Sequence, residues 1–436
     1  MSIFESNGIF DNDRVLRHDS YTPDEFLARE TQEQELVSAL KSVYRGSPPK
    51  NIVLRGKNGT GKTSLTKSIL ETLTEDCAEK GINVTTVYVN CSDSHNDKSS
   101  YDTTREITNS LREIRNPSGY DKIGSGYSQG ELYEKMFDEL ESSGDTNIIV
   151  LDELDGLGED EILYKISRAT TNGDLPMDTD VGLIGITNDP GCIKNFSPTV
   201  KDSLCEEFIE FSPYKATELE AILGARKEEA FVDGVLNDDV IPLCSAITAR
   251  DSGSARQALK LLEKSGEIAD DENADNVSVE HVREADTQID KDDVKNSLKG
   301  LTTQERLALL SVAIKSIDPS SSSNKVPTSD LFEAYETIAT RHGHSARSYN
   351  RFSDRLKALE QQNLISLTPT QKSGYQNTFD LEVNAALLIE AFDEIVSNGM
   401  AGESSGLQRT VEAIMKRAND AGEVSRRDLT LETCSF

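Results

Sequence analysis

Residues 51–65 read NIVLRGKNGTGKTSL, a glycine-rich loop between an apolar run and a helical pattern. Within it, residues 56–63 match G-x-x-x-x-G-K-[ST], a pattern that binds phosphate when a strand precedes it and a helix follows. Residues 51–54 are typical of a buried strand, and the apolar residues after the loop have helical spacing. A flexible surface turn is the alternative, but such a turn would not need a strand before it and a helix after it. The stretch therefore predicts a phosphate-binding loop.

In such a loop, glycines let consecutive backbone N–H groups converge on phosphate oxygens, and the positive end of the following helix adds to the field. Lys62 is expected to reach the β- and γ-phosphates of a nucleotide, and Thr63 to bind Mg²⁺. The expected ligands are therefore ATP or ADP with Mg²⁺. The expected contact residues are Asn58, Gly59, Thr60, Gly61, Lys62, Thr63 and Ser64.

Two further strand patterns end in polar residues. In IIVLDELD, residues 148–155, Asp152 is placed to bind Mg²⁺ and Glu153 to polarise an attacking water. Adjacent acids are common in an acidic chain, so this interpretation depends on the loop upstream. In VGLIGITND, residues 181–189, the amide of Asn188 would lie beside the γ-phosphate and orient water for catalysis, although an ordinary turn is the alternative.

Strand and helix patterns alternate through the first half of the chain. Strands are expected at 51–56, 83–90, 146–151 and 181–187, with helices between them and a first helix at 23–44. This alternation predicts an α/β fold with a parallel sheet covered on both faces. After residue 213 the patterns are helical, at 217–230, 240–250 and 254–269.

A third unit begins near Lys295. It has helix patterns at 303–317, 329–341 and 346–362, followed by strand patterns at 364–368 and 378–383. Three helices followed by a two-stranded wing is the order of a winged helix. The expected domains are a P-loop base at 1–211, a helical lid at 212–290, a winged helix at 295–390 and an extension of unknown role at 391–436.

Charge is the most unusual feature of the composition. Asp and Glu number 77 against 46 Lys and Arg, which gives a formal net charge of −31 spread along the chain. Such a charge opposes folding and DNA binding in dilute buffer, whereas at molar salt the screening length is only about 3 Å. The composition therefore favours a cytoplasm rich in salt over a merely acidic mesophilic protein.

The remaining composition excludes several classes of protein. The six cysteines are scattered without a C-x-x-C pair, which indicates reduced thiols and neither a disulfide scaffold nor a zinc site. No apolar run approaches the roughly 18 residues of a membrane span, and the first residues are not typical of a secretion signal. We therefore expect a cytoplasmic protein.

Together, the loop, the acid pair and Asn188 resemble an AAA+ ATPase. The finer pattern resembles the archaeal replication initiators related to the origin-recognition complex and to its cell-division-cycle-six relative. The matching segments include IFDNDRVLRHDSYTPDEFLARE, GYSQGELYEKMFDEL and GSARQALKLLEKSGEIA. The resemblance implies that Tyr214 and Arg226 contact the nucleotide and that Arg256, in the lid, reads the γ-phosphate. It also implies origin DNA, a replicative helicase and other initiator copies or paralogues as partners.

The chain departs from the family pattern at several positions. Thr199 stands where a basic residue is usual, and Lys201 lacks the planar fork that arginine would offer a partner's nucleotide. Hydrolysis assisted by a neighbouring copy is therefore in doubt. The usual Gly-Asp before the lid arginine is Gly253-Ser254, and the wing has Gly374 alone, without an arginine.

Two groups of arginines are candidates for DNA contact. Arg347, Arg351 and Arg355 have i, i+4, i+8 spacing and would form one stripe on the third helix of the winged unit. Arg105, Arg112 and Arg115 lie in an insertion at 92–126 that corresponds to the family's extra initiator helix. A solvated basic face is the alternative for the stripe.

Three functions stay open on the sequence alone. The first is an ATP-switched initiator that binds origin DNA and recruits a helicase, with slow hydrolysis. The second is a paralogous DNA-binding regulator without loading activity. The third is a clamp-loader-like ATPase whose winged unit binds protein. Association with the nucleoid is expected for the first two.

Overall fold

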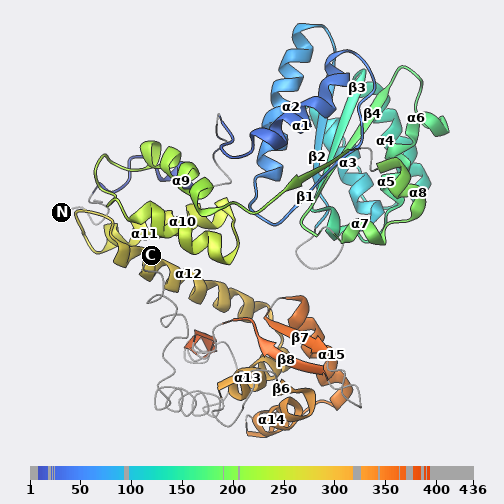
Figure 1. Cartoon of the computed structure of the whole chain (residues 1–436). Coiled ribbons are helices and arrows are strands. Elements are labelled where there is room, and N and C mark those ends of the chain that lie inside the picture. The colour runs from blue at the N-terminus through green and yellow to red at the C-terminus, as the bar shows by residue number, and fades with distance from the viewer. Residues whose placement is uncertain are drawn as a thin grey trace. The chain divides into compact units, whose positions relative to one another are not determined.

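The computed structural model describes residues 8–17, 21, 23, 25–92, 98–189, 191–204, 207–317, 326–341, 344–362, 364–369, 377–383, 387–388 and 390–392 (Figure 1). The chain divides into two compact units, Met1–Arg283 and Glu284–Phe436. Within the described ranges, no helix is long and apolar enough to cross a membrane. Most of the expected C-terminal extension, from residue 393 onward, lies outside them.

The first unit is built on a parallel sheet. In chain order, its five described strands are β1 Ile52–Gly56, β2 Val84–Asn90, β3 Thr146–Asp152, β4 Asp180–Thr187 and β5 Glu207–Phe211. They lie in the order β2-β3-β4-β1-β5, and every neighbouring pair is parallel. The predicted α/β fold is confirmed. This order brings the end of β1 beside the end of β4, with β3 next along.

Helices cover both faces of the sheet (Figure 1). On one face lie α1 Glu30–Tyr44 and α2 Lys62–Glu79, and on the other lie α3 Ser100–Arg115, α4 Gln129–Ser143 and α5 Glu161–Ser167. Ile148 and Val150 of β3 pack on the first face, whereas Ile149 and Leu151 pack on the second. Shorter elements complete the base: η1 Asp13–Leu16, η2 Leu154–Gly156, α6 Ala169–Asn172, α7 Cys192–Asn195 and α8 Pro198–Leu204.

Two element predictions for the base were wrong. The first helix begins at Glu30 and not at residue 23, because Ala28 has φ of 60°, a left-handed conformation that no helix continues through. Strand β5 was not predicted at all. It is an edge strand in which Phe208 and Glu210 are exposed while Ile209 and Phe211 are buried. That alternation was its only sequence signal.

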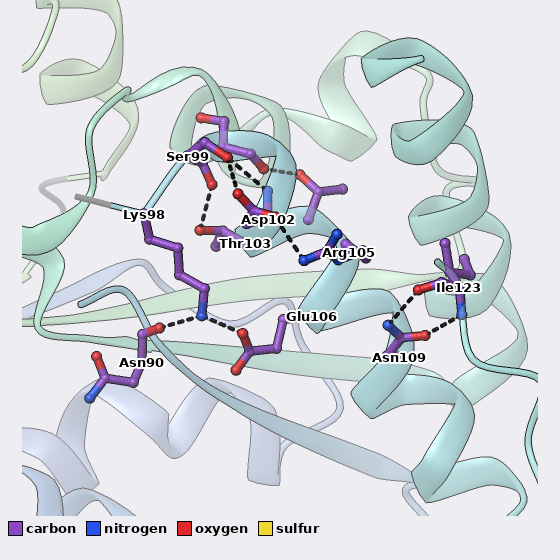
Figure 2. Close-up of polar contacts among 11 residues, drawn as sticks. Asn90, Lys98, Ser99, Asp102, Thr103, Arg105, Glu106, Asn109 and Ile123 are labelled. Carbon is purple, nitrogen blue, oxygen red and sulfur yellow. Dashed lines mark hydrogen bonds and ion pairs between the residues drawn. The ribbon is translucent and has the colours of Figure 1, made fainter. Parts of the chain in front are cut away.

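The insertion after β2 contains α3, which is held firmly to the base. The Asn109 side chain brackets the backbone of Ile123, accepting from its N–H at 2.7 Å and donating to its carbonyl at 3.2 Å (Figure 2). Lys98 donates to the Asn90 carbonyl at 2.8 Å and pairs with Glu106. Ile107 and Leu111 of α3 are buried in one core cluster with residues of β2, β3 and α4, so the described part of the insertion packs on the base domain. Residues 93–97 lie outside the described ranges.

The lid is helical, as expected. It contains α9 Ala216–Ala230, α10 Val240–Asp251 and α11 Ala255–Asp271, followed by the first residues of α12 Val279–Gly300. Helix α12 was not predicted, and it runs through the expected gap between lid and winged helix at 290–295. The N-terminal segment packs on the lid, because the rings of Phe10 and Phe231 lie 4.9 Å apart.

The second unit is a winged helix, which confirms the predicted class. It comprises α13 Thr303–Ile317, β6 Val326–Pro327, α14 Thr328–Arg341, α15 Tyr349–Gln361, β7 Ile365–Pro369 and β8 Asn377–Leu381. Its described strands form one sheet in the order β6-β8-β7. Strand β6 has two residues and was too short to predict. The expected wing turn, with Gly374, lies outside the described residues.

Candidate functional site

The glycine-rich loop connects β1 to α2 and has the backbone of a phosphate loop. Gly59 and Gly61 have φ of 71° and 91°, in the left-handed region that favours glycine, and Gly61 is the residue directly before α2. The loop therefore ends at a helix N-terminus, where several backbone N–H groups lack partners within the helix. Asn58 and Ser64 are exposed on either side of it.

Lys62 lies within the concave side of the loop. Its Nζ donates to the carbonyls of Gly56 at 2.6 Å and Lys57 at 2.8 Å, and to Asn188 Oδ1 at 2.9 Å. Burial lowers the pKa of Lys62 to about 8, against the opposing effect of the Asp152 and Asp155 carboxylates. The predicted lysine and the predicted strand-end asparagine are thus in direct contact.

The predicted metal ligands also meet. Thr63 Oγ1 donates to Asp152 Oδ2 at 2.8 Å, while Asp152 Oδ1 accepts from the Glu153 N–H at 2.9 Å. One hydroxyl and one carboxylate beside a phosphate loop suit Mg²⁺, which keeps several water ligands and takes few from protein. Glu153 has φ of 51°, so its backbone turns sharply at the strand end.

Sequence reasoning missed Asp155, which holds Asn188 in place. Asp155 Oδ1 accepts from the Asn188 N–H at 2.9 Å and from the Thr187 hydroxyl at 2.8 Å. The residue was visible as the second aspartate of DELD. Its partner lies 33 positions along the chain, however, and only the parallel pairing of β3 with β4 brings the two strand ends together.

The lid reaches the phosphate loop at the start of α11. The Ala255 N–H donates to the Gly59 carbonyl at 3.0 Å, and a side chain at Gly59 would collide with Ser254. Arg256 is the next residue, so its backbone lies beside the loop, as the resemblance implied for a phosphate-reading arginine. The Tyr214 hydroxyl lies 3.0 Å from the position of a Cβ on Gly61.

The other nucleotide candidates have different surroundings. Arg226 lies on α9, and its guanidinium stacks 4.1 Å from the centre of the Tyr21 ring. Lys201 lies on α8, where its Nζ donates to the Lys194 carbonyl at 2.8 Å. These two contacts join Arg226 and Lys201 to chain segments other than the phosphate loop.

Arg29 is a second residue that sequence reasoning missed. Only 4% of its surface is exposed, and its guanidinium donates to the carbonyls of Thr60 at 2.9 Å and Ser212 at 2.7 Å. It also stacks 3.6 Å from the centre of the Tyr214 ring. Arg29 thus contacts the phosphate loop and the connector into the lid together.

The arginines of the insertion are all paired with carboxylates. Arg105 pairs with Asp102 at 2.8 Å, and Arg112 and Arg115 each pair with the buried Glu139 at 2.8 Å. These pairs fasten α3 to α4 and to its own first turn. A phosphate would have to share or replace them, so their role in DNA contact stays a prediction.

The arginine stripe of the winged unit is only partly a stripe. Helix α15 is the predicted third helix, but it starts at Tyr349, two residues after Arg347, so the predicted start at residue 346 was wrong. All three arginines are exposed, and Arg355 pairs with Glu305 of α13 at 2.7 Å. All three line a cavity of about 560 Å³ with His344 and the start of α13.

The loop between β1 and α2, the acid at the end of β3, the asparagine at the end of β4 and the helical lid define an AAA+ nucleotide-binding fold. Comparison of the chain with known families agrees. The AAA domain matches residues 45–186, the Cdc6 AAA+ ATPase-type lid domain residues 220–287, and the CDC6 C-terminal winged helix domain residues 296–391.

Similar proteins narrow the class to one family. ORC1-type DNA replication proteins 15 and 1 of Haloarcula marismortui are 36% and 38% identical, covering 89% and 88% of this chain and 93% of each relative. The structure of the Aeropyrum pernix ORC1 protein in complex with DNA has a TM-score of 0.75 and 32% identity, and it covers 91% of this chain and 100% of that one. The chain belongs to the archaeal ORC1/Cdc6-type family of replication initiators.

Proposed function

We propose that the chain binds ATP with Mg²⁺ and uses ATP binding and slow hydrolysis to switch its binding of double-stranded origin DNA. The observation that carries the nucleotide half is the meeting of Lys62, Asn188, Thr63 and Asp152 at one sheet edge. These residues come from three separate segments, and each has the chemistry that a nucleoside triphosphate requires.

Each of these residues has a separate task. Lys62 gives up its hydrogen bonds to the loop carbonyls and donates to phosphate oxygens instead, because hydrogen bonds between charged groups are stronger. Thr63 and Asp152 hold the metal, which when bound would neutralise charge on the phosphates. Arg256 approaches the γ-phosphate from the lid, and Tyr214 and Arg226 contact the rest of the nucleotide. Ser64, Thr60 and the loop glycines contribute backbone and hydroxyl donors.

Lys62→Ala tests the nucleotide site. Removing a charge-assisted phosphate contact costs about 1.5–3 kcal/mol, so ATP affinity should fall at least ten-fold in filter binding. Lys57→Ala is the matched control, because Lys57 is an exposed lysine of the same loop. Equal affinity of wild type and Lys62→Ala would overturn the site.

The DNA half of the proposal depends on the winged unit. Arg347 and Arg351 are exposed and line the cavity together with Asp354 and the N-terminus of α13. Guanidinium groups next to a helix N-terminus suit a backbone phosphate, which would place α15 at the major groove. Arg355 lines the same cavity, but Glu305 already holds it, so we assign it to positioning α15.

The same features leave room for a paralogous regulator, which would bind DNA without recruiting a helicase. We favour the initiator because the similar Haloarcula marismortui proteins are ORC1-type DNA replication proteins. The A. pernix ORC1 protein in complex with DNA supports the DNA binding that both functions share. A replicative helicase and other initiator copies are the partners that we propose. Binding origin DNA would associate the protein with the nucleoid.

A further inference from the structure

Arg29 is an arginine buried beside the phosphate loop. Buried arginines are rare unless their charge is satisfied. This guanidinium donates to three backbone carbonyls, those of Thr60 at 2.9 Å, Ser212 at 2.7 Å and Ala28 at 3.0 Å. Ala28 itself has φ of 60°, which is uncommon for a residue other than glycine. The segment before α1 is thus held in an unfavourable conformation that brings Arg29 inward.

The Thr60 carbonyl belongs to the same peptide group as the Gly61 N–H. Because a trans peptide is planar, its C=O and N–H point in opposite directions. A hydrogen bond that fixes the Thr60 carbonyl on the Arg29 side therefore fixes the Gly61 N–H on the other side. Gly61 is the last residue before α2, in the part of the loop where phosphate loops offer their N–H donors.

The neighbouring peptide group is fixed in the same way by the lid. The Ala255 N–H donates to the Gly59 carbonyl at 3.0 Å, which orients the Thr60 N–H. The orientations of two consecutive N–H donors are thus fixed by residues outside the loop. Arg29 fixes the Gly61 N–H, and the start of α11 fixes the Thr60 N–H. Arg256, the proposed reader of the γ-phosphate, is the residue after Ala255.

Arg29 also contacts the connector into the lid. It donates to Ser212 and stacks 3.6 Å from the centre of the Tyr214 ring, and the Tyr214 N–H donates to the Gly253 carbonyl at 2.9 Å. Gly253 precedes Ser254 at the start of α11. One side of the guanidinium therefore holds the phosphate loop, and the other holds the segment that carries the lid.

We propose that Arg29 is a positioning residue that orients the Gly61 N–H toward the phosphates and fastens this peptide group to the lid connector. Nucleotide binding and lid position are thereby linked through one side chain. The proposal rests on the proposed nucleotide site. Arginine is required because its planar fork reaches two carbonyls at once, which a lysine ammonium does not reproduce.

The test measures ATP and ADP affinity with fluorescent nucleotides in Arg29→Lys, alongside thermal unfolding. Both affinities should fall roughly ten-fold, as expected when a charge-assisted hydrogen bond that sets a binding group is lost. Arg55→Lys is the matched control. Arg55 also adjoins the loop, pairs with an acid, Glu210, and lies 5.7 Å from the ring centre of Phe208. It should leave both affinities unchanged.

A double-mutant cycle with Arg256→Ala tests the link to the lid. In the Arg29→Lys background, Arg256→Ala should weaken ATP binding by a smaller factor than it does in wild type. If Arg29→Lys does not fold, Arg29→Met replaces it, because an apolar side chain of similar length avoids a buried charge.

Three results would overturn the proposal. A folded Arg29 variant that binds both nucleotides as wild type does would show a structural role only. If the double variant loses ATP affinity by the product of the two single losses, Arg29 and Arg256 are not coupled and the proposed link to the lid is wrong. A wild type that binds neither nucleotide would overturn the proposed nucleotide site first, and this inference with it.

Discussion

Lys62 has a charge that is costly in the free protein and useful once phosphate is bound. Its pKa is lowered from the ordinary 10.5 to about 8 because the side chain is buried. Above pH 8 the free protein therefore holds Lys62 increasingly neutral, and binding phosphate requires it to take up a proton. Well below pH 8, Lys62 is already charged, so phosphate binding requires no proton uptake.

We predict that ATP affinity is nearly constant below about pH 7, begins to fall near pH 8, and falls by up to about ten-fold for each pH unit above that. The phosphates do not contribute, because their last ionisation is complete near pH 6 to 7. Isothermal titration calorimetry in two buffers would detect the proton uptake. Lys62→Met should remove the dependence, and a flat wild-type profile would contradict the assignment.

Glu153 is the residue that we expect to activate water. Glu153→Gln keeps the shape of the side chain and removes the base, so hydrolysis should fall by about 10²–10⁴-fold while ATP binding is retained. Single-turnover hydrolysis and filter binding on the same preparation separate the two effects. Turnover at the wild-type rate in the variant would exclude Glu153 as the base.

Local sequence motifs were sufficient to single out Lys62, Thr63, Asp152 and Asn188 as candidates, because each lies in a pattern tied to a strand end, and the structure brings their side chains into contact. They were not sufficient for Arg29 or Asp155. Both residues act on groups more than 30 positions away, Arg29 on Thr60 and Asp155 on Asn188. Only the folded arrangement of strands creates these contacts.

At the scale of elements, helix α15 shows what a periodic pattern can and cannot predict. Helical spacing predicts an apolar face of Tyr349, Phe352, Leu356 and Leu359; the last three are buried, whereas Tyr349, in the first turn of the helix, is exposed. The spacing does not predict where the helix starts, because Ser348 precedes the helix with extended backbone and leaves Arg347 outside. The edge strand β5 was missed because a strand of five residues with only two buried side chains gives a weak signal.

The arginines of the winged unit should differ in their effect on DNA binding. Although burial alone would raise the pKa of Glu305, hydrogen bonds from Thr302 and Arg355 hold it below its ordinary value. Glu305 therefore stays ionised and keeps Arg355 paired. Arg351 is exposed and one turn away on the same helix.

We predict that Arg351→Gln lowers the slope of log affinity against log salt by about one unit, as for one lost phosphate contact. Arg355→Gln should leave the slope nearly unchanged. Fluorescence anisotropy with one duplex over a range of KCl concentrations gives both slopes. Equal slopes for wild type, Arg351→Gln and Arg355→Gln would show that α15 does not make the DNA contact.

For the whole molecule, the net charge of −31 sets the conditions in which these parts can work. A DNA-binding protein with this charge is repelled by its ligand in dilute buffer, and screening at high salt removes most of the repulsion over distances beyond a few ångströms. Exposed cations such as Arg347 and Arg351 can then contact DNA phosphates at short range. The acidic composition indicates a salt-rich environment, and similar proteins come from the halophilic archaea Haloarcula and Halobacterium.

The central claim is that ATP controls the binding of this protein to origin DNA, and a genome-wide occupancy map tests it most directly. The map would compare wild type with Lys62→Ala in cells, alongside a marker-frequency profile that locates replication starts. We expect discrete wild-type peaks at a replication start, and we expect these peaks to weaken in Lys62→Ala. Peaks confined to promoters, or peaks of equal height in the variant, would contradict it.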